Sequence, residues 1–143
     1  MIWLLRHGDA EDDAASDAAR ELTEKGRRQA RVAGAALAAL GARVDACLTS
    51  PRVRARDTAA IACAKLDVEP EEEAALEGGD FDPADVAADR GDVLLVGHEP
   101  DFSRAIQAAT GSRVELKKGG LAAIEGGTLI TLLRPGALKR IAG

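Results

Sequence analysis

Runs of apolar residues alternate along this chain with stretches in which apolar residues recur every three or four positions. Residues 1–5 form an unbroken apolar run, and residues 92–96 form a second such run behind a single aspartate. Apolar runs of this length, bounded by polar residues, predict buried β-strands. Residues 44–49, which end in Cys-Leu-Thr, predict a third and shorter strand.

Helical spacing follows the first two predicted strands. Thr23 provides the N-cap of a helix that ends at Gly41. The apolar face of this helix comprises Ala30, Ala33, Leu37 and Leu40. Ser50 as N-cap and Pro51 at the first helical position predict a second helix that runs to about Lys65.

The last third of the chain predicts a β-hairpin. Residues 121–125 and 128–133 flank Gly126 and Gly127, a two-residue connection that suits a hairpin turn. The other predicted elements are a short strand at 66–70, an acidic turn or helix start at 71–73, a short helix at 83–86, a helix from Pro100 to Gly111 and an edge strand at 138–141. This order predicts an α/β fold, a three-layer α/β/α sandwich with a mixed, mainly parallel central sheet and an antiparallel C-terminal hairpin at its edge.

Composition narrows the class of protein. The chain has 143 residues, 46% of them hydrophobic, and a net charge of −5. We expect one domain over residues 1–143, without a cap domain, because no insertion is long enough to form one. The acidic balance argues against nucleic acid as a partner. Without a membrane-length apolar run or signal-peptide features, we expect a cytoplasmic protein that does not contact membranes. Cys47 and Cys63 lack CxxC spacing, so we expect reduced, semi-buried thiols, with a disulfide or metal role as the alternative.

Residues able to carry chemistry gather where the predicted strands end. Arg6, His7 and Gly8 follow the first strand, Arg54 lies in the first turn after the second, and His98 follows the run at 92–96. The carboxyl ends of parallel strands share one rim, where ligands bind in open α/β sheets. The Arg54 side chain leans back toward its helix N-terminus, which itself favours an anion. Two arginines and two histidines on one rim predict a pocket for a phosphate-like oxyanion.

Each of these residues also has a simpler interpretation. A single histidine is usually a surface residue or a satisfied core residue, and Arg54 alone would be a surface salt bridge; their convergence favours a site. Arg52 and Arg56 are expected on the solvated face of their helix. The chain has no P-loop or dinucleotide fingerprint. Two histidines, with only Asp9 or Glu99 to recruit, make a poor metal site, so we expect no metal and no cofactor.

Five blocks of this sequence resemble the histidine phosphatase superfamily, whose mark is an Arg-His-Gly after the first strand. The match is closest to its small branch, the SixA-type phosphohistidine phosphatases, and extends over nearly the whole chain. The matching blocks are LLRHGDA (4–10), RELTEKG (20–26), TSPRVRARDTA (49–59), LLVGHEPDFS (94–103) and LKKGGLAAIE (116–125). The resemblance implies that His7 is the nucleophile that becomes phosphorylated. The phosphate pocket would then consist of Arg6, Arg54 and His98.

Three further expectations concern the surroundings of His7. Gly8 allows close approach of the backbone to the substrate, and a carbonyl near it is predicted to accept a hydrogen bond from His7 and so to fix the tautomer. Arg20, in the Arg-x-Leu-Thr block, either contacts phosphate or substrate at the rim or pairs with the acidic loop 11–13. His98 is expected to be protonated, so that it neutralises charge on the phosphate.

A general acid is harder to assign. Larger superfamily members use a carboxylic acid to protonate the leaving oxygen, and the candidates here are Glu77, Asp80 and Glu99, none of which lies in a convincing motif. Imidazole leaves from phosphohistidine far more readily than an alkoxide leaves from an ester. The lack of a clear general acid therefore favours a substrate with a P–N bond over a phosphate ester. The short segment before Asp92 leaves the site open, which suits a phosphohistidine presented on a protein surface.

We therefore expect a metal-independent phosphohistidine phosphatase that acts on a protein through a covalent phospho-His7 intermediate. A histidine phosphotransfer domain or a phosphocarrier protein would be the partner, by analogy with the family. One alternative is a general phosphomonoesterase for a small phosphorylated metabolite, with Glu77 or Asp80 as its acid. The other is a non-catalytic phosphate-binding module, which the complete set of four site residues disfavours.

Overall fold

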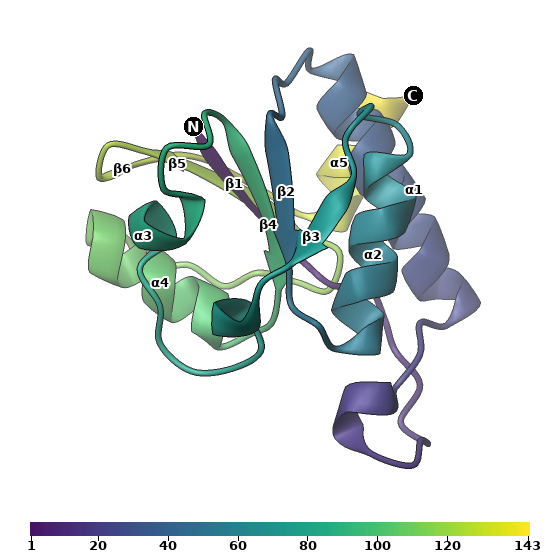
Figure 1. The fold of residues 1–143 in the computed structure, drawn as a ribbon. Coiled ribbons are helices and arrows are strands. Elements are labelled where there is room, and N and C mark those ends of the chain that lie inside the picture. The colour runs from purple at the N-terminus through teal and green to yellow at the C-terminus, as the bar shows by residue number, and fades with distance from the viewer.

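Six strands form a single sheet in the order β3-β2-β4-β1-β5-β6 (Figure 1). The computed structural model describes all 143 residues, Met1–Gly143. The first four strands are parallel, whereas β5 runs antiparallel to β1 and β6 antiparallel to β5. The strands are β1 (Ile2–Arg6), β2 (Ala46–Thr49), β3 (Pro70–Glu72), β4 (Val93–Gly97), β5 (Leu121–Glu125) and β6 (Thr128–Leu133). The sheet is thus mixed and mainly parallel, with the predicted hairpin at one edge.

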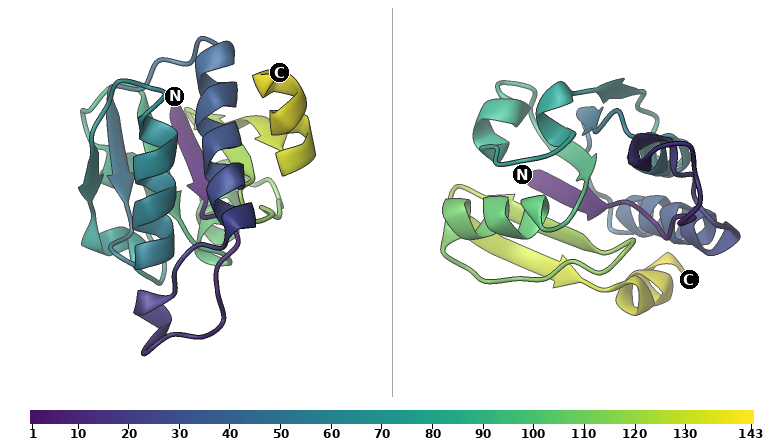
Figure 2. Two further views of the ribbon diagram at one scale, coloured as in Figure 1. Left: turned by 90° about the vertical axis from the view of Figure 1, so that its right-hand side faces the viewer. Right: turned by 90° about the horizontal axis from the view of Figure 1, so that it is seen from below.

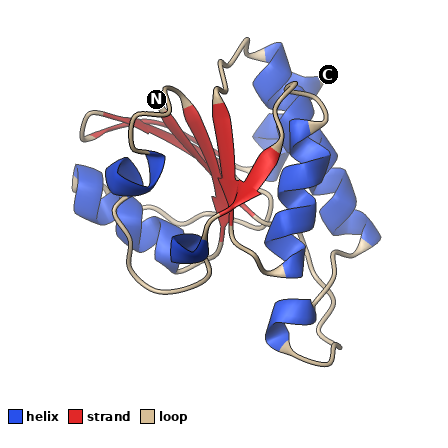
Figure 3. Ribbon diagram, viewed as in Figure 1, coloured by secondary structure: helices blue, strands red, loops and turns tan.

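Helices cover both faces of this sheet, which gives the predicted three layers (Figures 2 and 3). One face is covered by α1 (Glu24–Ala39), α2 (Val53–Cys63) and α5 (Pro135–Ala142), and the other by α3 (Pro83–Ala87) and α4 (Asp101–Thr110). Two short 3₁₀ turns, η1 (Asp17–Ala19) and η2 (Ala74–Leu76), lie in the connections. None of the helices has both the length and the apolar character that crossing a membrane requires.

Small side chains let the helices pack closely. The chain has one Trp, two Phe and no Tyr, so its two cores consist largely of Ala, Leu, Val and Ile. Helices α1 and α2 approach each other so closely that a Cβ atom added at Gly34 would lie 2.5 Å from the carbonyl oxygen of Ala62. A Cβ added at Gly8 would likewise lie 2.5 Å from the carbonyl oxygen of Gly26 in α1. The contact between Gly8 and Gly26 brings the carboxyl end of β1 against the first turn of α1.

The register of the parallel strands aligns their carboxyl ends. Arg6 of β1 lies opposite Gly97 of β4, and Thr49 of β2 lies opposite Val96 of β4. The residues that follow these strands therefore leave the sheet at one rim. The segment between β1 and α1, which carries η1, extends past this rim (Figures 1 and 2).

Most predicted elements are present, and the N-cap of α1 is confirmed because Thr23 Oγ1 accepts a hydrogen bond from the Gly26 amide. The predicted edge strand at 138–141 is wrong. Those residues belong to α5, which begins with Pro135 at its first turn and buries Leu138 against the core. Spacing of three between Leu138 and Ile141 suits one face of a helix rather than a strand.

Three other predictions in the middle of the chain need correction. The strand predicted at 66–70 lies at Pro70–Glu72, as the edge strand β3 with exposed glutamates. Glu71 and Glu72 therefore do not form a turn, whereas Glu73 does start a short helical turn: it is the N-cap of η2, and its carboxylate accepts a hydrogen bond from the Ala75 amide at 3.1 Å. Helix α2 begins at Val53 with Arg52 at the N-cap, not at Pro51 with Ser50 as the cap. The Ser50 hydroxyl oxygen does accept a hydrogen bond from the Arg52 amide, at 3.2 Å, in the turn that precedes the helix.

The close contact between α1 and α2 predicts the outcome of a glycine substitution. Gly34→Ala should destabilise the protein by about 1–3 kcal/mol, because the new methyl group collides with backbone that cannot move away without separating the helices. Chemical denaturation monitored by circular dichroism measures this free energy of unfolding. Gly136→Ala is the matched control, because no atom lies within 4 Å of the added Cβ. Alanine favours a helix more than glycine does, so this substitution should leave the free energy of unfolding unchanged or raise it slightly. An unchanged free energy of unfolding in Gly34→Ala would contradict this packing of α1 against α2.

Candidate active site

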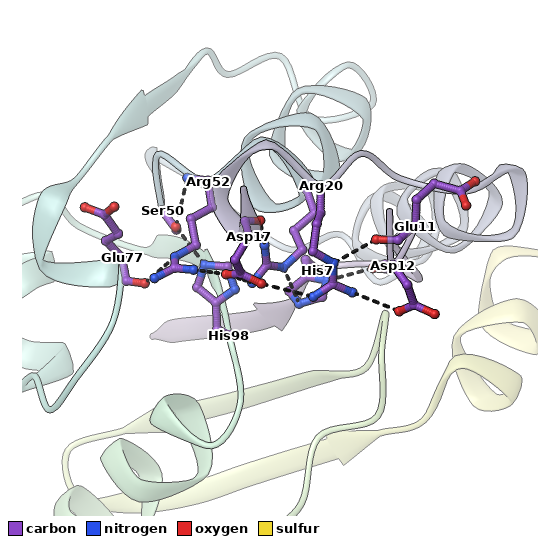
Figure 4. Close-up of polar contacts among 11 residues, drawn as sticks. His7, Glu11, Asp12, Asp17, Arg20, Ser50, Arg52, Glu77 and His98 are labelled. Carbon is purple, nitrogen blue, oxygen red and sulfur yellow. Dashed lines mark hydrogen bonds and ion pairs between the residues drawn. The ribbon is translucent and has the colours of Figure 1, made fainter. Parts of the chain in front are cut away.

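The four predicted site residues come together at the rim. Arg6 is the last residue of β1, His7 and His98 directly follow β1 and β4, and Arg54 lies in the first turn of α2. The imidazole rings of His7 and His98 have centroids 5.2 Å apart. Arg54 Nε donates toward His7 Nε2 at 3.3 Å. His7, His98 and Arg54 are all buried, and Figure 4 shows the two histidines among the arginines of the rim.

One ring nitrogen of His7 is held by the backbone. His7 Nδ1 lies 2.7 Å from the carbonyl oxygen of Gly8, and because a carbonyl only accepts, Nδ1 carries the proton. The other nitrogen, Nε2, then presents a lone pair, which matches its role as acceptor of the Arg54 Nε–H. The contact confirms the predicted bond to a carbonyl near Gly8. It leaves Nε2 as the nucleophilic atom of the ring.

The turn at Gly8 is tied to α2 by a buried threonine that the sequence analysis did not single out. The Gly8 amide donates to Thr58 Oγ1 at 3.1 Å, and the Thr58 hydroxyl donates to the Arg54 carbonyl oxygen at 2.7 Å. Thr58 thus joins the turn that holds His7 to the helical turn that holds Arg54. A threonine four residues after a site arginine points from the same helix face, which is the signal that could have found it.

Burial keeps both histidines neutral in the free site. Burial lowers the pKa of His7 to about 4, with Arg54 and Arg6 lowering it further and the Gly8 carbonyl opposing them. Burial lowers the pKa of His98 to about 3, with smaller contributions in the same direction from His7 and Arg54. His98 is therefore neutral in the free site, because burial among cations disfavours another positive charge. The expected protonated His98 concerns the site with phosphate bound and stays a prediction.

His98 has one nitrogen engaged and one free. Its Nε2 lies 2.7 Å from the hydroxyl oxygen of Ser50. Its Nδ1 is buried and has no hydrogen-bond partner. Unsatisfied buried polar atoms are uncommon in folded proteins and are found where a ligand or a proton is accepted. Ser50, which follows β2, therefore orients His98 rather than capping α2.

A carboxylate from the β1–α1 segment neutralises the arginines of the rim. Asp17 pairs with Arg54 at 3.2 Å, with Arg20 at 3.2 Å and with Arg52, and its carbonyl oxygen accepts from Arg54 at 2.8 Å. Burial alone would raise the pKa of Asp17, but hydrogen bonds from Arg20 and Arg54 outweigh it and lower that pKa. The contacts are drawn in Figure 4. Like Thr58, Asp17 was missed by sequence reasoning, although an Asp three residues before Arg20 is a usable signal. Arg52, expected on a solvated helix face, instead pairs with Asp17 at the rim.

Arg20 and Arg6 have different surroundings from those of Arg54. Arg20 donates to the carbonyl oxygen of Glu11 at 2.7 Å and pairs with Asp12 at 3.6 Å, so the alternative of pairing with the acidic loop is the arrangement present in the free site. Arg6 donates to the carbonyl oxygen of Leu116 at 2.9 Å, while its Nε is buried without a partner. Both guanidinium groups keep donors available at the rim.

The three candidate acids lie in unequal positions. The Glu99 carboxylate accepts hydrogen bonds from the amides of Ser103, at 2.7 Å, and Leu116, at 3.1 Å, so it braces the loop instead of facing the site. Glu77 is exposed, and its carbonyl oxygen accepts from Arg52 Nε at 3.0 Å. Asp80 is exposed and lines a cleft beside α4. No hydrogen bond or ion pair joins any of the three carboxylates to His7, His98 or Arg54.

The cysteines and possible metal ligands lie apart from this chemistry. Cys47 of β2 and Cys63 of α2 are buried free thiols within the core under α1 and α2. They are fully buried rather than semi-buried as expected, and the neighbouring Cys63 thiol and burial raise the pKa of Cys47. No group of three or more His, Cys, Asp or Glu side chains is arranged to hold a metal ion.

Known sequences and structures are similar to this chain. The model of the histidine phosphatase superfamily (branch 1) matches residues 2–90. An uncharacterized protein of Picosynechococcus sp. is 34% identical over 140 residues, which cover 88% of this chain and 85% of that protein. The mitochondrial serine/threonine-protein phosphatase Pgam5 of Drosophila ananassae is 47% identical over 60 residues, but these cover 42% of this chain and only 21% of Pgam5.

Among solved structures, the protein histidine phosphatase SixA complexed with tungstate has a TM-score of 0.83 to this chain, with 24% identity over 96% of this chain and 99% of SixA. At that identity the likeness concerns the fold. The superfamily match covers more than half of the chain and includes Arg6, His7 and Arg54. The chain therefore belongs to the histidine phosphatase superfamily, a family of phosphatases, and has the three-layer fold of SixA.

Proposed function

We propose that this protein removes phosphate from phosphohistidine on another protein, through a covalent intermediate on His7. The observation that carries the proposal is the buried, neutral His7. Its Nδ1–H is held by the Gly8 carbonyl and its Nε2 lone pair faces the Arg54 guanidinium. Such a nitrogen attacks phosphorus without first losing a proton. The surrounding arginines supply the positive charge that phosphoryl transfer requires.

In the first step, His7 Nε2 attacks the phosphorus and the P–N bond of the substrate breaks. If the second nitrogen of the substrate ring carries a proton, the leaving group departs as neutral imidazole and needs no acid. An alkoxide leaving from a phosphate ester always needs a proton. Glu77, Asp80 and Glu99 make no contact with His7 or His98, and Asp17, the carboxylate at the rim, has a lowered pKa despite its burial because of hydrogen bonds from Arg20 and Arg54, so it is a poor proton donor. The absence of a carboxylate contact to His7 or His98 therefore supports a P–N substrate.

In the second step, water attacks the phosphorus of phospho-His7 and the new P–N bond breaks. Inorganic phosphate leaves, and His7 regains its lone pair on Nε2. Arg6 and Arg54 would hold the equatorial oxygens in both steps. The dianion would also raise the pKa of His98, whose Nδ1 has no partner in the free site, so His98 would take up a proton only when phosphate is bound.

A phosphate ester is the second candidate substrate. Pgam5, which shares 47% identity with part of this chain, carries the name of a serine/threonine-protein phosphatase. Glu77 is exposed beside Arg52, close enough for its carbonyl to accept from that side chain, and it would be the acid of an esterase mechanism. This alternative covers small phosphorylated metabolites as well as phosphoproteins.

A comparison of substrates tests the proposed function. In EDTA, kcat/KM should be higher by at least about 100-fold for a phosphohistidine protein than for any ester in a panel of phosphoserine peptides and sugar phosphates. His7→Ala should lose activity by more than about 1,000-fold. Rapid quenching at alkaline pH should trap an acid-labile phosphate on the wild-type chain and none on His7→Ala. Preference for an ester, with loss of activity in Glu77→Gln, would replace the proposal with the esterase.

The protonation state of His7 provides a second prediction. Because its pKa is lowered to about 4, the ring should stay neutral from neutral pH down to about pH 5, whereas an ordinary histidine titrates near about 6.5. The ring proton resonances of the two histidines in the chain, assigned with the His98→Gln variant, report this by NMR. Adding inorganic phosphate should move the His98 midpoint upward. A His7 midpoint near 6.5 in the free protein would contradict the burial argument.

The Asp17 contacts generate a third prediction. An incoming phosphate needs the same guanidinium N–H groups that Asp17 occupies, so removal of the Asp17 charge should strengthen the binding of inorganic phosphate. We expect Asp17→Asn to lower the inhibition constant of phosphate by about tenfold, the effect of one charge-assisted contact. Asp13 is exposed in the same segment, where the ion pairs involve Asp12 and Asp17 instead, so Asp13→Asn is the control. Weaker phosphate binding in Asp17→Asn would mean instead that Asp17 organises the arginines for the ligand.

A further inference from the structure

Cationic side chains gather on one side of the active site although the chain as a whole is acidic. We propose that the groove between α1, the loop 115–120 and α5 binds an acidic segment of the protein substrate that lies beside its phosphohistidine. This inference rests on the proposed function and names the chemistry of the partner. The groove is called the basic groove below, and it is lined by residues of α1, of that loop and of the start of α5.

Two adjoining clefts make up the basic groove. The first has a volume of about 540 Å³ and begins at Arg6, the residue before His7. The second has a volume of about 350 Å³ and continues between α1 and α5 as far as Lys139. Lys25, Gln29 and Pro135 line both clefts, so the two are continuous. A ligand seated in the groove would therefore reach the phosphate pocket through Arg6.

The groove has more positive charge than its own carboxylates neutralise. Its two carboxylates, Asp9 and Glu115, are already paired with Lys118 at 3.2 Å and Lys117 at 3.1 Å. Four more cations line the groove and take part in none of the ion pairs of the structure. They are Lys25, Arg28, Arg134 and Lys139, all of them exposed. Unpaired, exposed cations in a concave surface attract an anionic partner and repel a basic one.

Acidic residues predominate elsewhere at the rim. The segment 11–17, which extends past the rim, contains four acidic residues, and Glu71, Glu72 and Glu73 lie at the carboxyl end of the edge strand β3. Arginines near these segments are already paired, such as Arg52 with Asp17 and Arg90 with Glu71. An acidic partner would be repelled there and accepted only on the basic groove. The charge distribution thus orients a protein substrate as well as attracting it.

The lining of the groove suits a peptide segment rather than a lone metabolite. Besides its cations, the second cleft is lined by Gly119, Pro135, Gly136 and the half-buried Val32. At Gly119, φ is +76° and an added Cβ would lie 2.8 Å from the Cβ of Gln29, so a glycine is needed for the loop to lie this close to α1. A cleft with small and aliphatic residues beside exposed cations fits a short segment that carries acidic side chains beside small apolar ones.

Charge reversal tests the basic groove without touching the phosphate pocket. In the test variant, Lys25, Arg28 and Lys139 are all replaced by Glu. In the control variant, Lys65, Arg104 and Arg113 are replaced by Glu; these are also exposed, take part in no ion pair and give the same change in net charge. The substrates are a histidine phosphotransfer domain phosphorylated with phosphoramidate, and phosphoimidazole as a small substrate without a protein surface.

We expect the test variant to raise KM for the phosphorylated domain by at least about tenfold while kcat changes little, and to flatten the salt dependence of kcat/KM. Its kcat/KM for phosphoimidazole should equal that of the wild type. The control variant should resemble the wild type with both substrates. Equal losses in the test and control variants, or an equal loss with phosphoimidazole, would overturn the inference.

A binding measurement keeps the inference separate from the proposed function. Two peptides that carry a non-hydrolysable phosphoryl-triazolylalanine, flanked in one by glutamates and in the other by lysines, are compared by fluorescence anisotropy. The wild type should bind the acidic peptide at least about tenfold more tightly, and the test variant should lose this preference. If the wild type turns over no phosphohistidine protein but keeps the preference, only the proposed function fails. Equal binding of both peptides, or tighter binding of a single-stranded RNA of equal length, overturns the basic groove as a protein-docking site.

Discussion

The site depends on one tight contact between two glycines. Gly8, directly after His7, lies against Gly26 in the first turn of α1, and neither position has room for a Cβ atom. The Gly8 amide is held by Thr58 of α2, and its carbonyl holds His7 Nδ1. One turn of backbone therefore joins β1 to two helices and sets the direction of the histidine ring. Any side chain at Gly8 would separate these elements and turn Nε2 away from Arg54.

The same packing explains how cations and neutral histidines coexist. Two imidazole rings 5.2 Å apart beside several arginines would repel one another if they were protonated, and their burial makes protonation costly. The rings therefore stay neutral, which is the state a nucleophile needs. The arginines are in turn neutralised in part by Asp17, a half-exposed carboxylate that an oxyanion of higher charge can displace. The free site is thus organised around the shape and charge of the group it is to receive.

The site residues at the strand ends could be predicted from the sequence, because their positions follow from the local pattern of apolar residues and from the topology of the sheet. Arg6, His7, Arg54 and His98 each follow an apolar run or begin a helix, and parallel register aligns those positions. Asp17 could not be placed in this way, since its contact with Arg54 joins a loop to a helix 37 residues away. The protonation state of His98 in the free site could not be predicted from the sequence pattern either, because it depends on how deeply the ring is buried. The error over α5 arose because apolar residues spaced by three in a short segment were assigned to a strand.

The exposed basic groove and the buried site residues meet at Arg6. A small ester would need a carboxylic acid to protonate its leaving oxygen, and none of Glu77, Asp80 and Glu99 contacts His7 or His98. A phosphohistidine on a protein brings a leaving group that departs as neutral imidazole, and it brings a surface that can be held outside the pocket. The unpaired cations of the basic groove provide such a hold at a distance from the reacting atoms. Binding energy and chemistry would then be supplied by different parts of the molecule, which lets a small site act on a large substrate.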